Sequence, residues 1–149
     1  MTDANPSYPA RHLKGIPTKG EVDAQGLPTP VVFRFKTPPE PRSDSMTESS
    51  INWEDDDQAI PFTLNQRKPN GDVQFRYGVA IIPTSSLTQL PAIVHQIAGS
   101  GFTFERRVVD GNKYHGNYLI LSATPGHIQH RIEATLSLLV TEVVKRDAV

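Results

Sequence analysis

The prolines of this chain are concentrated towards one end, which limits what the N-terminal third can fold into. Eight of the 13 prolines lie in the first 50 residues, at positions 6, 9, 17, 28, 30, 38, 39 and 41. Proline has no backbone N–H, so repeated prolines interrupt helices and central strands. The large apolar residues of the first 30 positions are isolated and follow no period. The sequence therefore predicts an extended arm over residues 1–58, followed by one small domain over residues 59–149.

One run inside this predicted arm has the composition of a strand. Residues 31–36 read VVFRFK, with prolines on both sides. A single strand is unstable, so it must add to the edge of a sheet, either in a partner or in the chain's own domain. The residues predicted to make that contact are Val32, Phe33 and Phe35.

The only tryptophan of the chain, Trp53, stands immediately before four acidic residues. An aromatic ring beside acidic side chains is typical of a short docking motif, because the ring supplies contact area and the acids steer it to a basic surface. The alternative is that Trp53 packs on the adjacent domain as its first ordered residue.

From residue 61 onward, apolar runs alternate with turn signals. Asn70-Gly71 and Asp110-Gly111 are both typical of hairpin turns. The predicted elements are, in order, strands over residues 61–65 and 73–81, a helix whose regular part begins near residue 88 and ends at 99, a hairpin of residues 102–109 and 112–121, and a last helix that Thr124 caps and Pro125 begins.

This β-β-α-β-β-α order predicts an α+β two-layer sandwich, with an antiparallel four-stranded sheet and two helices on one face. It is a circular permutation of the ferredoxin-like order, which says little about function because that fold hosts many activities. The last helix carries Leu138 opposite its main apolar stripe, so we expect Leu138 to contact a partner.

A two-residue Asp110-Gly111 turn would pair residues 109 and 112 and place Tyr114, Tyr118 and Arg107 on the sheet face away from the helices. Such a face, with Arg76 nearby, could stack on single-stranded nucleic acid. The alternative is a face covered by another subunit or by the arm. The charge of residues 60–149, with nine basic and six acidic residues, is modest for a polyanion ligand.

Several chemistries find no support in the sequence. The chain has no cysteine, which excludes disulfides and thiolate metal sites. His115, His127 and His130 are the metal candidates but lack the spacing of a known site, so no metal and no cofactor are expected. Ser100, Glu105, Glu133 and His95 have no identifiable catalytic partner, so no enzyme is expected.

The sequence favours a non-enzymatic assembly or adaptor subunit. Its partners would be other protein subunits, including copies of itself, and subunits of virions and other large assemblies often carry such arms. Single-stranded nucleic-acid binding is the alternative, and a small enzyme is third. No secretory signal and no apolar run of membrane-spanning length is present, so the cytoplasm or an assembled particle is the expected location.

Overall fold

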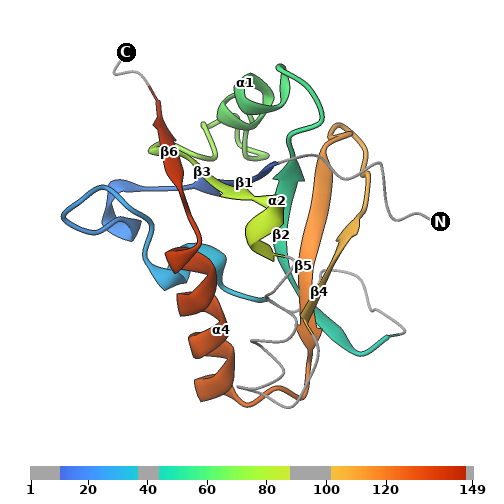
Figure 1. Ribbon diagram of the computed structural model, residues 1–149. Helices are drawn as coiled ribbons and strands as arrows, with labels where there is room; N and C mark the ends of the chain where they lie inside the picture. The colour runs from blue at the N-terminus through green and yellow to red at the C-terminus, as the bar shows by residue number, and fades with distance from the viewer. Residues whose placement is uncertain (1–10, 37–43, 88–101, 147–149) are drawn as a thin grey trace.

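The strands of the protein form one antiparallel sheet. The computed structural model describes residues 11–36, 44–87 and 102–146. Within these ranges the sheet has six strands in the order β4-β5-β2-β1-β3-β6 (Figure 1). Their bounds are β1 Arg11–Ile16, β2 Met46–Trp53, β3 Gly78–Pro83, β4 Phe102–Arg106, β5 His115–Leu121 and β6 Glu142–Lys145.

The sheet consists of two halves with a narrow junction. β1 pairs with β3 over all six of its residues, and β2 pairs with β5 over seven residue pairs. Between the halves, β1 and β2 share only the pairs His12–Trp53 and Leu13–Asn52. Beyond that junction the two strands diverge, and Figure 1 shows β1 and β3 crossing the view while β2 and β5 run steeply down it. We call the gap between residues 14–16 of β1 and 48–51 of β2 the sheet split.

An ion pair supports the junction on its outer side. The Arg11 guanidinium donates from Nε and Nη2 to the two carboxylate oxygens of Glu54, at 2.6 and 2.7 Å. The Glu54 N–H also donates to the Arg11 carbonyl oxygen at 3.1 Å. A bidentate pair fixes both distance and orientation, so it holds β1 and β2 together where the ladder is shortest.

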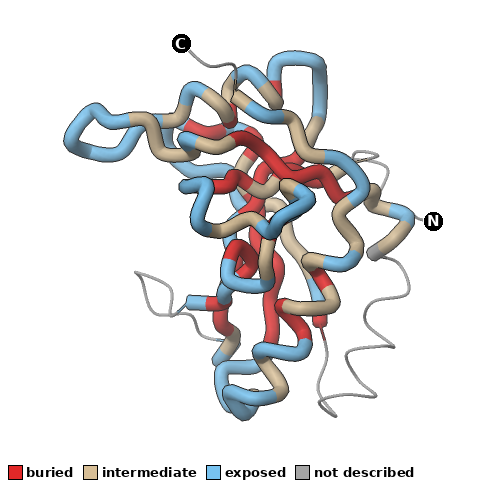
Figure 2. The backbone as a smooth tube through the Cα atoms, turned by 90° about the vertical axis from the view of Figure 1, so that its left-hand side faces the viewer, coloured by how far each residue is buried: buried red, intermediate tan, exposed pale blue. Residues whose placement is uncertain are grey.

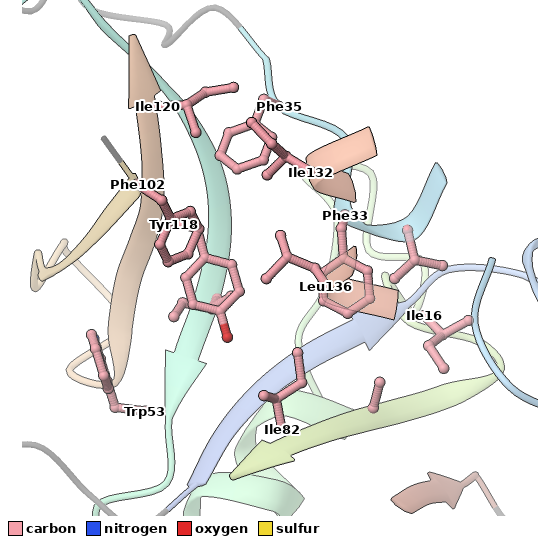
Figure 3. Close-up of a cluster of buried hydrophobic side chains, with 13 residues drawn as sticks. Ile16, Phe33, Phe35, Trp53, Ile82, Phe102, Tyr118, Ile120, Ile132 and Leu136 are labelled. Atoms are coloured by element: carbon pink, nitrogen blue, oxygen red, sulfur yellow. The ribbon is translucent and has the colours of Figure 1, made fainter. Parts of the chain in front are cut away.

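The main core fills the space between the two halves. Helix α4, Gly126–Leu138, and the 3-10 helix η2, Pro30–Phe33, pack there against each other and against both halves (Figure 3). The fully buried side chains include Phe33, Tyr118, Ile132 and Leu136. Figure 2 shows buried residues running through the centre of the molecule, with exposed residues over the loops.

Helix α4 binds the segment after η2 through its polar side chains. Glu133 Oε2 accepts the Phe35 N–H at 3.0 Å, and Gln129 Nε2 donates to the Phe35 carbonyl oxygen at 3.3 Å. These two bonds give partners to the N–H and the carbonyl oxygen of buried Phe35. In a sheet, a neighbouring strand would supply such partners. Lys36 then forms an isolated bridge with Glu48 on the edge of β2.

The second face of the sheet is covered by helix α1, Ala59–Leu64. Its buried Ala59 packs with Leu13, Val79, Ile81 and Tyr114. A further short helix, α2, Thr84–Leu87, follows β3 directly, and the short 3-10 helix η1 spans Lys19–Glu21. Because both faces are covered, the inner strand β3 is buried along almost its whole length.

The α+β class and the antiparallel sheet are confirmed, but the predicted strand count is wrong. The sheet has six strands rather than four, and a ferredoxin-like order is not confirmed. Three observed strands, β1, β2 and β6, are not among the predicted ones, and the predicted strand over residues 61–65 is absent. β1 and β2 come from residues 1–58, the range of the predicted arm. These two strands could not be predicted from local sequence patterns, because the strands with which each one pairs lie about 40 or more positions away in the chain.

Four further local predictions need correction. Residues 31–36 are not a strand, because Pro30–Phe33 forms a 3-10 helix. Residues 61–65 lie in and just after α1 rather than in a strand, and β3 begins at Gly78 rather than at residue 73. The apolar period of the last helix predicts that it continues to Val143, but helix α4 ends at Leu138 and Val143 lies in β6. The helix predicted from residue 88 lies outside the described residues.

A truncated chain tests the place of the first 58 residues in the fold. Residues 59–149 alone lack β1 and β2, which lie between β3 and β5 in the sheet. We therefore expect that fragment to lose cooperative thermal unfolding, as measured by circular dichroism, and the full chain to retain it. Cooperative unfolding of the fragment at a similar midpoint would contradict the fold described here and support an independent C-terminal domain.

Candidate anion-binding pocket

A cavity of about 420 Å³ opens at the sheet split. Its walls come from β1, β2, η2, the segment after η2, and the loop before β3. The volume lies within the range of small-molecule sites, about 300–1,000 Å³. Its lining residues are Lys14, Gly15, Pro17, Glu21, Val31, Val32, Arg34, Lys36, Glu48, Ser50, Lys68, Gln74 and Phe75. We call it the split pocket.

Lys14 crosses the split from β1 to β2. Its Nζ donates to Ser49 Oγ at 3.1 Å and, through a short contact, to the Ser50 carbonyl oxygen. The backbone groups of even-numbered residues in β2 point to the side on which β1 lies. The Glu54 N–H, just after β2, donates to Arg11 of β1 on that side, and Glu48 bonds to the Lys36 backbone on the same side. Lys14 therefore satisfies a carbonyl that the divergence of the two strands leaves without its ladder partner.

The environment of Lys14 disfavours its charged form. Burial, together with the smaller effect of the nearby Lys36 cation and against the opposing effect of Glu21, lowers the pKa of the Lys14 ammonium from 10.5 to about 7. Desolvation and a like charge both act against protonation. At neutral pH, charged and neutral forms of Lys14 are thus both populated.

Positive charge predominates around this lysine. The pocket lining contains the cations Lys14, Arg34, Lys36 and Lys68 and the acids Glu21 and Glu48. Within the described parts of the chain, Arg34, Lys36 and Lys68 form no ion pair. With Lys14 protonated, the lining carries two surplus positive charges; these attract an anion, and the low-dielectric walls strengthen that attraction.

The backbone around η2 brings two of these cations to the pocket. Buried Phe33 and Phe35 alternate with Arg34 and Lys36, which are exposed. Lys36 and Glu48 exchange backbone bonds at 2.7 and 3.1 Å, and Thr47 Oγ1 donates to the Lys36 carbonyl oxygen at 2.6 Å. The buried phenylalanines therefore anchor the segment while the alternate side chains face the cavity rim.

Phe75 closes the opposite wall. Its ring lies directly against the backbone of Gly15, where any Cβ atom would collide with it. Glycine permits this close approach of a ring to a strand. A smaller cavity of about 150 Å³ lies on the α1 side of the sheet. It shares four lining residues with the split pocket, namely Gly15, Ser50, Gln74 and Phe75, so the opening at the sheet split continues towards that face.

His115 and Ser50 meet beside this smaller cavity. His115 Nδ1 lies 2.8 Å from the Arg107 carbonyl oxygen, and Nε2 lies 3.4 Å from Ser50 Oγ. The first contact fixes the proton on Nδ1 and leaves Nε2 as an acceptor. At 3.4 Å, however, the second contact is longer than the 2.6–3.2 Å or so of a nucleophile with its base.

The predicted aromatic face is not open. Tyr118 is fully buried and Tyr114 is 2% exposed, so neither ring is available to stack on a base. Tyr118 O–H bonds to Nδ1 of buried His12 at 3.0 Å, and Tyr114 O–H donates to Asp56 at 2.8 Å. Burial, with a smaller effect of Arg106, lowers the pKa of His12 to about 3, so His12 is a neutral member of the core.

A shift of one residue in strand register accounts for the burial of Tyr118, whereas Tyr114 is buried with Ala59 of α1 in the other cluster. Residues 109 and 112 do pair, as predicted, but Phe102 pairs with Ile120 rather than with Leu119. The second strand of the hairpin therefore has one extra residue between Asn112 and Ile120. A shift of one position in the pairing moves each side chain of a strand to the opposite face of the sheet. Tyr118 is therefore turned into the core beside Phe102, at a centroid distance of 5.4 Å.

The other predicted contact residues are scattered. Val32, Phe33, Phe35 and Trp53 are buried in the core. Trp53 therefore packs, as in the alternative to a docking motif, but as the last residue of β2 and not as the first ordered residue of a domain. Arg76 and Arg107 are exposed and lie near Asp72 and Glu105, respectively. Leu138 is 84% exposed, so it remains available for contact. Of all these residues, only Val32 reaches the split pocket.

The metal candidates do not cluster. In the described ranges no three histidine, aspartate, glutamate or cysteine side chains lie close enough to hold an ion together. His95 and Ser100 lie outside these ranges. None of the described helices is long and apolar enough to cross a membrane.

Sequence reasoning overlooked Lys14, Arg34, Lys36 and Lys68. The sequence does indicate that Arg34 and Lys36 share one side of their segment, because aromatic and basic residues alternate over 33–36. Lys14 stands alone between apolar residues and gave no such signal. A comparison of the chain with family models, curated proteins and solved structures found no match.

Proposed function

We propose that the protein binds a small anionic ligand in the split pocket. The observation that carries the proposal is Lys14, whose amine is held inside a cavity where three further cations lack ion pairs with described residues. A protonated lysine at this position lowers the stability of the empty protein, and a bound anion would offset that effect. The role is one of binding, with no chemical step required.

Sulfate is a suitable first probe, because it stays doubly charged across the pH range of the experiment. We expect saturable sulfate binding by titration calorimetry at pH 6. Lys14→Met should weaken it by about 10- to 100-fold, the effect of losing one charged hydrogen bond. Lys113→Met is the matched control, since Lys113 is exposed and pairs with Asp56 away from the pocket. We expect that control to bind sulfate as the natural chain does.

The pH dependence follows from the lowered pKa of Lys14. An anion raises this pKa, so the bound form holds more protons than the empty form. Affinity is therefore full below pH 7 and falls as pH rises through about 7, by up to about tenfold per pH unit. Lys14→Met should abolish this slope. Equal sulfate affinity of the natural chain and Lys14→Met at pH 6 would contradict the proposal.

The assembly function remains a second proposal, with a second copy of this chain as the partner. β6 is an outer strand of the described sheet. Arg146 N–H donates to the Tyr77 carbonyl oxygen, so alternation turns the backbone groups of Val143 and Lys145 away from β3. Two copies could pair there around a two-fold axis at Val144, with Glu142 of one strand opposite Arg146 of the other.

This second proposal predicts a dimer in solution. Light scattering should give about twice the chain mass of 16.5 kDa at high concentration. Val143→Pro removes an outward N–H and should yield monomers, and Leu138→Ser should weaken the dimer if the exposed end of α4 takes part. Val108→Ser changes an exposed apolar residue elsewhere and should have no effect. A natural chain that stays monomeric at every concentration would refute the assembly proposal.

A further inference from the structure

The hydrogen bonds of Lys14 suit a neutral amine. An ammonium has three N–H donors, whereas a neutral amine has two and a lone pair. Lys14 Nζ makes two donations, to Ser49 Oγ and to the Ser50 carbonyl oxygen. In the neutral form both N–H groups therefore have acceptors, and the lone pair is left without a role in the fold.

The surroundings of this amine are those of a nucleophilic lysine. A lysine becomes a nucleophile when burial and a neighbouring cation favour its neutral form. At Lys14 both causes act, because the half-buried side chain is enclosed by the pocket walls and Lys36 is nearby. Arg34, Lys36 and Lys68 can meanwhile hold the anionic part of a ligand, which leaves Lys14 to meet a different group of the same molecule.

We infer that Lys14 forms an imine with a small carbonyl compound that also carries an anionic group. This inference rests on the proposed anion-binding function and names the class of ligand. The lone pair of Nζ attacks the carbonyl carbon, and the resulting carbinolamine loses water. The carbonyl oxygen leaves with the two amine protons, and a C=N bond replaces the C=O bond. No oxidation or reduction takes place.

Pyridoxal 5′-phosphate is a direct probe, because it contains both an aldehyde and a phosphate group. The protein is incubated with the probe at pH 7.5, treated with borohydride to reduce the imine, digested and mapped by mass spectrometry. We expect the label on Lys14, approaching one per chain. Pyridoxal, which lacks the phosphate group, should require at least about tenfold higher concentration for the same labelling, since a charged contact contributes about that factor.

Two variants separate the imine from the anion site. Lys14→Arg keeps a cation but has no reactive amine, so it should lose the label and still bind sulfate. Lys113→Arg should keep the label at Lys14. Label spread over exposed lysines with no preference for Lys14, or equal labelling by pyridoxal, would overturn the inference. If sulfate still binds in that case, the proposed function survives, whereas loss of sulfate binding as well would refute both.

Discussion

The short junction between β1 and β2 is the constraint on which the rest of the structure depends. Two residue pairs and the Arg11–Glu54 ion pair join the halves of the sheet. Beyond them the strands separate, and the space between the halves is filled by α4 and η2. The separation also leaves part of the β2 edge without a strand, so the Lys14 amine bonds to Ser50 and the Lys36 backbone pairs with Glu48. The core and the split pocket are thus two consequences of one divergence.

The cations at the split are held by structure that serves the core. Phe33 and Phe35 must be buried for the halves to close over α4, and their alternation sends Arg34 and Lys36 to the opposite side. Lys14 lies on the central strand β1, between the buried residues Leu13 and Gly15. Burial of a lysine is unfavourable for stability, and such residues are characteristic of sites where a ligand is bound or a proton is moved. This link between packing and charge is the physical basis of the proposed function.

Local patterns predicted the parts of the fold that local interactions determine. The 102–121 hairpin, the apolar stripe of α4 and the exposure of Leu138 could be read from periodicity and turn residues. The positions of β1 and β2 could not, because proline content suggested an arm and their partners are distant in sequence. The candidate site was missed for the same reason, since Lys14, Arg34 and Lys68 meet only after the two halves have assembled. The burial of Tyr118 depended on one extra hairpin residue, which no sequence period indicates.

The ionisation of Lys14 is the most direct test of this account. The ε-carbon of each lysine can be followed by carbon-detected NMR as pH is raised, with the Lys14 signal assigned by its loss in Lys14→Met. The enclosed amine, close to Lys36 at the sheet split, predicts a midpoint near pH 7 in the empty protein, with a shift to higher pH when sulfate is added. A Lys14 midpoint near 10.5, unchanged by sulfate, would show that this lysine is solvated and that the split pocket does not exist as described.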